Sequence, residues 1–370
     1  MSNGSLSDAD RILRSEDSEA APNREAPVAA EPASQTDQAD DGKDHGGVLR
    51  WSVIAIVLIA VVLFGLGIWW SLQPSKFDVE EEVQALLGAD ARPVPGAVTV
   101  ASAIAVADTL LNKPGGYLRN DITPPGILMD NMPSWEYGLL TELRDSIRAL
   151  RNDFSRSQTQ SIENEDLKNA DANFNFDAES WILPSSEEQY RQGVEALRRY
   201  LDELMAGVPQ ARFYARADNL RAYLMVVEKR LGSYGQRLSA SVGDEELTAA
   251  LSSEGTAPPP ASGSTVAVNR TAFTEIDDVF YEARGYSWAL LHMMKALAED
   301  FAPVLEQKNA EVSMQQIIRD LEYATMFKLS PMVLNGSGFG VLANHSLVLA
   351  SYMSRANAAV LDLRVLLERG

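Results

Sequence analysis

The stretch IDDVFYEARGYSWALLHMMKALAEDF, residues 276–301, decides the fold because one set of its residues recurs at alternating steps of four and three. The set consists of Ile276, Phe280, Ala283, Ser287, Leu290, Met294, Leu297 and Phe301. An α-helix completes a turn in about 3.6 residues, so this spacing places the whole set along one face. We therefore predict one long helix that buries this face against other helices.

Similar patterns occur on both sides of this stretch, and no strand-like alternation of useful length appears. Helices are predicted over 77–88, 100–113, 133–154, 186–207, 210–241, 311–329 and 349–367. Ser134 is the expected N-cap of the third of these, and Leu363 is an expected core residue of the last. Residues 155–185 are polar and rich in Asn and Asp, which predicts irregular structure there.

A second decisive stretch is WSVIAIVLIAVVLFGLGIWW, residues 51–70, which carries no charged residue. At about 1.5 Å per residue, a helix of this length crosses a hydrocarbon core of roughly 30 Å. We expect residues 51–71 to contact the lipid bilayer as a transmembrane helix, with Trp51 at one membrane interface and Trp69 and Trp70 at the other. The predicted fold is all-α, a single N-terminal transmembrane helix followed by a soluble multi-helix bundle.

Two alternatives for this apolar stretch are less favoured. A buried core helix would be unusually long and unusually apolar. A cleaved signal peptide would not follow about fifty polar residues, and the next residues, SLQPSKF, offer no small-residue cleavage site. We interpret the stretch as an uncleaved signal anchor.

The positions of Lys and Arg beside the span favour one orientation. Arg50 directly precedes the span, whereas Lys76 lies six residues beyond Trp70. Because positive residues tend to remain in the cytoplasm, we expect a cytoplasmic N-terminus in a single-pass protein. In a Gram-negative bacterium, the C-terminal domain would then lie in the periplasm, anchored in the inner membrane.

Composition divides the rest of the chain. Residues 1–50 hold five Lys and Arg against eleven Asp and Glu, which predicts a disordered acidic tail. Residues 77–370 form the expected helical extracytoplasmic domain. The segment SSEGTAPPPASGST, residues 252–265, has the composition of a linker and marks a possible sub-boundary, although one body is favoured over two.

The composition and motifs of the chain argue against several classes of function. A net charge of −20 without a Lys and Arg cluster argues against a nucleic-acid partner. The absence of Cys and the presence of only three His argue against a thiolate or multi-His metal centre, and no cofactor is expected. The run NADANFNFDAES, residues 169–180, alternates oxygen-bearing side chains but lacks the Gly of a calcium loop. The Gly-rich stretch 334–346 fits no phosphate-binding motif and is interpreted as a turn.

The stretch NKPGGYLRNDITPPGILMDNMPSWEYG, residues 112–138, crowds Gly and Pro beside charges and aromatic rings. An ordered connector between helices is the favoured interpretation, because its Gly and Pro residues match helix ends and turns. A ligand or partner surface is the alternative, and its candidate residues are Arg119, Asp121, Asp130 and Trp135.

The span, the block GGYLRNDITPPGILMDNMPSWEYG and the later YARADNLRAYL, residues 214–224, together resemble an uncharacterised proteobacterial membrane-anchored family, domain of unknown function 2333. The resemblance covers about residues 50–370 and implies a Gram-negative inner-membrane setting. It implies no activity, substrate or catalytic residue.

Three functions follow in order of preference. The first is a non-enzymatic envelope protein that binds another envelope protein or itself through its helical domain. The second is an extracytoplasmic sensor that binds a small ligand. The third, an envelope enzyme, is least favoured because no nucleophile and base occur in a recognisable pattern.

Overall fold

The computed structural model describes residues 45–88, 91–156, 163–242, 271–327, 333, 335 and 344–369. The chain divides into two compact units, residues 1–55 and 56–370. Of the first unit, the described residues are 45–55, which form the start of the first helix. The acidic tail predicted for 1–50 and the 252–265 segment therefore lie largely or wholly outside the described residues.

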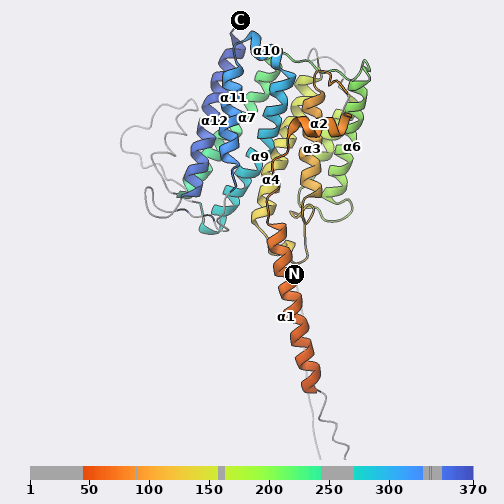
Figure 1. Cartoon of the computed structure of the whole chain (residues 1–370), viewed down its shortest axis with the longest axis vertical. Helices are drawn as coiled ribbons and strands as arrows, with labels where there is room; N and C mark the ends of the chain where they lie inside the picture. The colour runs from red at the N-terminus through yellow and green to blue at the C-terminus, as the bar shows by residue number, and fades with distance from the viewer. Residues whose placement is uncertain are drawn as a thin grey trace, which may run out of the picture. The chain divides into compact units, whose positions relative to one another are not determined.

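The described residues confirm the all-α prediction (Figure 1). The α-helices are α1 His45–Trp70, α2 Val79–Leu87, α3 Ala97–Asn112, α4 Asn131–Ala149, α5 Glu165–Phe174, α6 Ser186–Met205, α7 Ala217–Val242, α9 Ile276–Asp300, α10 Ala302–Gln307, α11 Glu311–Ala324 and α12 His345–Glu368. Short 3-10 turns cover Gly126–Leu128 and Phe273–Glu275, and a π-helical turn covers Leu150–Phe154. No strand occurs in these described ranges.

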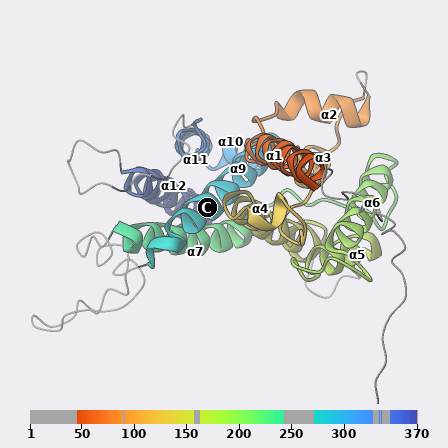
Figure 2. The same cartoon turned by 90° about the horizontal axis from the view of Figure 1, so that it is seen from below.

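Helix α9, the long helix predicted from residues 276–301, lies at the centre of the bundle in residues 56–370. It packs against α3, α4, α7 and α11, and the end-on view shows these helices around it (Figure 2). Leu290 and Met294 are fully buried, as the spacing predicts. Burial extends to the opposite face at Trp288 and His292, because neighbours cover α9 on several sides.

Helices on both sides of the 252–265 segment pack together within this unit. Helix α12 lies along α7, and α9 lies along α4. Leu363 of α12 is fully buried, as predicted. One continuous hydrophobic core therefore includes residues from Val79 through Leu367.

Two glycines allow α4 and α9 to approach unusually closely. A Cβ placed on Gly138 of α4 would lie 1.9 Å from the carbonyl oxygen of Glu282, and one on Gly285 of α9 would lie 1.8 Å from that of Trp135. Both distances are far inside van der Waals contact, so no larger residue fits without moving a backbone. The two glycines thus fix the position and the closeness of the central helix pair.

Some predicted boundaries were wrong for local reasons. Helix α4 begins at Asn131 rather than near Ser134, because Asp130 serves as the N-cap and accepts a hydrogen bond from the Asn131 N–H at 2.7 Å. Ser134 instead donates to the Asp278 carboxylate at 2.9 Å. The irregular 155–185 region contains α5, which buries Phe174 on its apolar side.

Helix α1 contains the expected span. Within Leu49–Trp70, the most apolar 18-residue window has a mean hydropathy of 2.8, and none of that window is buried. A helix that is apolar throughout and uncovered by protein is suited to lipid surroundings. Length and composition therefore make α1 a candidate membrane span, and it is the one such helix in the described ranges.

The close approach of α4 and α9 predicts that a Gly→Ala substitution lowers stability at Gly138 or Gly285 but not at an open helical position. Gly138→Ala or Gly285→Ala should lower the free energy of unfolding by at least about 2 kcal/mol, because the added methyl group forces α4 and α9 apart. Gly232→Ala is the matched control, since a Cβ at this α7 position meets nothing within 4 Å. That control should raise stability by up to about 1 kcal/mol through helix propensity. Denaturant unfolding measures all three, and equal effects at Gly138 and Gly232 would contradict the contact.

Candidate functional site

The linker that follows α1 is attached to α9 by a buried arginine. Arg284 is only 4% exposed. Its guanidinium donates to the Gln73 side-chain oxygen at 3.0 and 3.2 Å and to the carbonyl oxygens of Ala324 and Met326 at 3.1 and 3.0 Å. The carbonyls at the end of α11 carry partial negative charge and partly offset the buried cation. The arginine thereby joins α9, α11 and the linker.

Arg284 also lies in a pocket of about 310 Å³, here called the juxtamembrane pocket. Its lining residues are Gln73, Pro74, Ser75, Lys76, Trp135, Arg284, Trp288, Thr325 and Phe327. The two charged lining residues, Lys76 and Arg284, are both cationic. Burial lowers the pKa of Arg284 to about 10, which leaves the side chain charged at neutral pH. This electrostatic setting suits an anion with an apolar portion.

Trp288 lines the pocket and carries a buried polar group. Its side chain is 3% exposed, and its indole N–H has no hydrogen-bond partner among the described residues. A buried donor without a partner is costly, so a bound acceptor would relieve that cost. Trp135 lies beside it with ring centroids 5.6 Å apart, and together the two indoles form an aromatic wall.

His292 fixes the linker on the other side of Trp288. Its Nε2 accepts a hydrogen bond from the Phe77 N–H at 3.2 Å, and its Nδ1 lies 2.7 Å from the Trp288 carbonyl oxygen. These partners require the neutral tautomer with the proton on Nδ1. Burial lowers the pKa of His292 to about 4, so the ring is neutral at physiological pH. It therefore positions the linker by packing and hydrogen bonding.

The predicted connector, residues 112–138, is held by a buried carboxylate. Glu136 is fully buried and accepts hydrogen bonds from the backbone N–H groups of Leu118 and Arg119, each at 2.9 Å. It also forms an ion pair with Lys113, whose side chain is buried as well. Burial raises the pKa of Glu136, while Lys113 and the two N–H groups oppose that rise. The loop is consequently tied to α4 by a satisfied polar cluster.

The four predicted candidates of this loop do not converge on one site. Arg119 pairs with Glu179 at 2.9 Å and lies 4.4 Å from the Tyr137 ring centroid. Asp121 lies against Gly126, and burial is the main cause that raises its pKa. Asp130 caps α4, as described above. Only Trp135, 1% exposed, reaches the juxtamembrane pocket.

The three tryptophans expected at membrane interfaces differ in their surroundings. Trp51 is 74% exposed and Trp69 is 53% exposed. Trp70 is partly buried against the core, and a Cβ on Gly115 would lie 2.8 Å from its ring. The ring of Trp70 therefore packs on the start of the 112–138 loop, while the interface assignment of all three residues stays a prediction.

A second group of buried polar residues lies between α4, α7 and α9. The Glu142 carboxyl accepts hydrogen bonds from the Ser146 hydroxyl at 2.6 Å and the Tyr223 hydroxyl at 2.5 Å. Burial raises the pKa of Glu142 to about 8. A strongly shifted carboxyl is often catalytic, but none of these three residues lines the juxtamembrane pocket or the groove described next. We assign the cluster a structural role.

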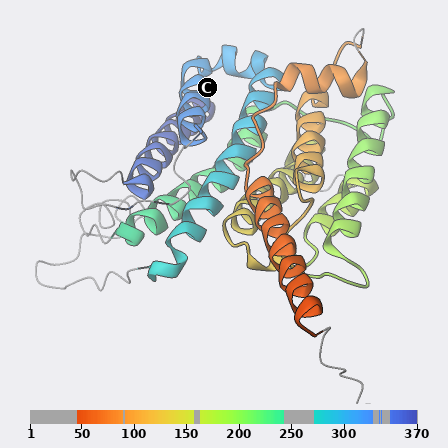
Figure 3. The ribbon, with the colours of Figure 1, turned by 60° about the horizontal axis from the view of Figure 1, so that its bottom comes forward.

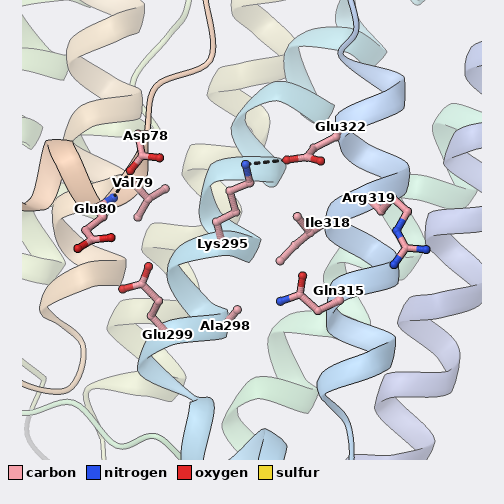
Figure 4. A pocket seen from close by; sticks show the side chains of 10 residues that line it. All are labelled: Asp78, Val79, Glu80, Lys295, Ala298, Glu299, Gln315, Ile318, Arg319 and Glu322. Carbon is pink, nitrogen blue, oxygen red and sulfur yellow. Dashed lines mark hydrogen bonds and ion pairs between the residues drawn. The ribbon is translucent and has the colours of Figure 1, made fainter.

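A more open groove of about 430 Å³ lies between α2, α9 and α11 (Figure 4). Its lining residues are Asp78, Val79, Glu80, Lys295, Ala298, Glu299, Gln315, Ile318, Arg319 and Glu322. Lys295 pairs with Glu322 at 2.8 Å. Figure 4 shows Glu80 and Glu299 on one side and Arg319 on the other. The groove therefore presents both acidic and basic side chains to solvent.

The alternating oxygen-bearing run at 169–180 is divided between α5 and the loop after it. Asp171 accepts hydrogen bonds from Arg151 at 2.7 Å and Asn175 at 2.8 Å, so its oxygens are already engaged. In the ranges that the structure describes, no group of three or more His, Cys, Asp or Glu residues could hold a metal ion.

Sequence reasoning missed the two residues that matter most in the pocket. Arg284 and Trp288 lie within the 276–301 stretch. The prediction for this stretch rested only on the residues of its apolar face, and these two are not among them. The available signal was a cation between two small residues, Ala283 and Gly285, within a helix predicted to be buried on one face. Its partner Gln73 is 211 residues away in sequence, and no local pattern predicts that contact.

The fold and these sites define an all-helical protein with one candidate membrane span in the described residues and a pocket lined by the linker that follows this span. The chain belongs to the family DUF2333, described as "Uncharacterized protein conserved in bacteria", which it matches over residues 43–370. This match confirms the resemblance seen in the sequence. Comparisons with curated proteins and with solved structures gave no match.

The Glu142 cluster predicts a specific dependence of stability on pH. Its folded pKa of about 8 exceeds the ordinary value of 4.5, so the folded protein retains a proton that the unfolded chain has released. This contribution is complete below pH 4.5 and is lost as pH rises towards 8, at up to about 1.4 kcal/mol per pH unit.

Glu142→Gln should remove that slope, because the amide does not ionise and its oxygen still accepts from Ser146 and Tyr223. Thermal unfolding between pH 5.5 and 8 measures the slope, and Glu195→Gln on the exposed side of α6 is the control. Parallel loss of stability in the native protein and the Glu142→Gln variant would contradict the assignment.

Proposed function

We propose that this protein is a non-enzymatic, membrane-anchored component of the bacterial cell envelope that acts by binding another protein. In this proposal α1 crosses the inner membrane once, the N-terminus is cytoplasmic and the helical domain is periplasmic. The bacterial family and the apolar α1 support the setting. The position of Arg50 at the start of the span supports the orientation.

The groove between α2, α9 and α11 is the observation that carries the binding role. Burial raises the pKa of Glu299, and the nearby charges of Asp300, Glu80 and Asp78 raise it further. Carboxylates that repel one another at an accessible surface favour a partner that brings a cation. Arg319 on the opposite wall would pair with an acidic residue of the same partner.

A photo-crosslinking amino acid at Gln315 tests this role in intact cells. Gln315 is exposed in the groove, and we expect a discrete adduct with one envelope protein or a second copy. Lys229, exposed on α7, is the matched control position and should give no such adduct. Glu299→Lys should weaken the Gln315 adduct several-fold. No adduct at Gln315, or equal adducts at both positions, would contradict the proposal.

The orientation has a separate test. A reporter that is active only in the cytoplasm should be inactive when fused after Gly370 and active when fused before Met1. Because the two fusions differ only in their end of the chain, each controls for expression of the other. The reverse result would place the domain in the cytoplasm.

A ligand-binding sensor is the second candidate, and the juxtamembrane pocket is the observation that favours it. Arg284, Lys76 and the unpartnered Trp288 N–H form a setting for an anionic small molecule. Such a molecule retained by the purified full-length protein, and released by Lys76→Glu, would favour this candidate over the first.

A further inference from the structure

The 112–138 loop is attached to the last turn of α1. Gly67 lies three residues before the end of α1, and a Cβ placed on it would lie 3.7 Å from the Pro125 Cβ. Trp70 packs on Gly115 in the same way. Figure 3 shows the connection between α3 and α4 beside this end of α1. The loop and the final residues of the candidate span therefore lie at the same level.

The tip of this loop exposes large apolar side chains. Ile122 is 49% exposed, Ile127 is 55% exposed and Leu128 is 79% exposed. Loops at a water-facing surface are usually polar. Three large aliphatic residues within seven positions form a patch that water solvates poorly.

A second loop, joined to the first, also exposes large apolar side chains. Trp181 is 53% exposed, Ile182 is 50% exposed and Leu183 is 90% exposed, and all three lie between α5 and α6. The preceding residues are joined to the first loop, because Asn120 donates to the Ser180 carbonyl oxygen at 2.8 Å and Tyr117 donates to that of Ala178 at 2.8 Å. We call the six exposed residues the apolar collar: Ile122, Ile127, Leu128, Trp181, Ile182 and Leu183.

The depth of α1 in a bilayer decides what covers the collar. Leu49–Trp70 comprises 22 residues. At about 1.5 Å per residue this length only just exceeds a hydrocarbon core of roughly 30 Å. Gly67 and Trp70 therefore reach the boundary between hydrocarbon and headgroups, and so does the loop in contact with them.

We propose that the apolar collar inserts into the interface of the bilayer that α1 crosses. This inference rests on the anchoring role of α1 in the proposed function. Trp181 suits that depth because its indole is apolar with one polar edge. The cations of the collar's own loops are already engaged, since Lys113 pairs with buried Glu136 and Arg119 pairs with Glu179. Insertion is consequently apolar and does not depend on anionic lipid.

The collar gives the domain a defined position on the membrane. The span supplies one attachment, and the two loops supply a second and a third beside it. The helical domain is then held against the lipid surface at a fixed height, and the juxtamembrane pocket opens close to the headgroups. A single flexible attachment would impose neither restriction.

Single-cysteine labelling tests the collar directly, because the native chain contains no Cys. The full-length protein is placed in vesicles of uncharged phosphatidylcholine with a fluorescent label at Leu128→Cys or Leu183→Cys. Val312→Cys on α11 is the matched aqueous control, at an apolar residue that is 81% exposed. Ile59→Cys within α1 is the control for the span. All four positions are exposed, so the labels do not disturb the core.

Labels at 128 and 183 should be quenched several-fold more strongly by a lipid-borne quencher than by a water-soluble one, as should the label at 59. The label at 312 should show the reverse. If the label at 59 is shielded from water while those at 128 and 183 behave like the label at 312, the proposed insertion of the collar is wrong and the membrane anchor is supported. If 59 is also reached from water, the anchor of the proposed function fails, and the collar fails with it.

Two further outcomes would overturn the apolar insertion. Loss of shielding at 128 and 183 when each vesicle holds one protein would show that a second copy covers the collar. Shielding that requires anionic lipid, or that disappears in concentrated salt, would show electrostatic attachment instead. Shielding that survives both dilution and salt supports the proposal.

Discussion

The close approach of α4 and α9, which Gly138 and Gly285 allow, is the constraint on which the other features of the domain depend. Because neither residue has a side chain, α4 and α9 meet backbone to backbone. This closeness brings Trp135 beside Trp288 and Ser134 to Asp278. Helix α4 then holds the 112–138 loop through Glu136, while α9 holds the linker after α1 through Arg284. Both attachments of the domain to the end of α1 therefore converge on one helix pair.

Buried polar groups in this bundle join elements that are distant in sequence. Glu136 joins a helix to a loop backbone, Glu142 joins α4 to α7, and Arg284 joins α9 to the linker and to the end of α11. Removing charge from water is costly, and apolar replacements often give equal or greater stability. Groups of this kind can instead specify which arrangement forms, because displacement of a helix would leave a buried polar group without its partner.

Periodic burial could be predicted from the sequence, whereas long-range polar contacts could not. The alternating steps through Leu290 and Met294 identified the central helix, and the uncharged run before Trp70 identified the candidate span. The polar segment that forms α5 was predicted as irregular, because it contains only two large apolar residues, Leu167 and Phe174. Of the four residues singled out in the loop, Trp135 reaches the pocket, while Arg119 acts locally. The position of Arg284 in the pocket could not be predicted, because its role depends on a glutamine 211 residues away.

The linker between α1 and α2 also has a mechanical consequence. Gln73 is bonded to Arg284, and Phe77 lies against His292 with ring centroids 3.9 Å apart, so the linker is fastened to α9 at two successive levels. A pull or a twist on the end of α1 would therefore act directly on these two contacts, because the linker is held at both of them. Tilt and rotation of the span would thus be transmitted to the central helix as rigid displacement. In the proposed membrane setting, the end of α1 would work as a shaft fixed to α9, and a change in the tilt of that end would turn the domain with it.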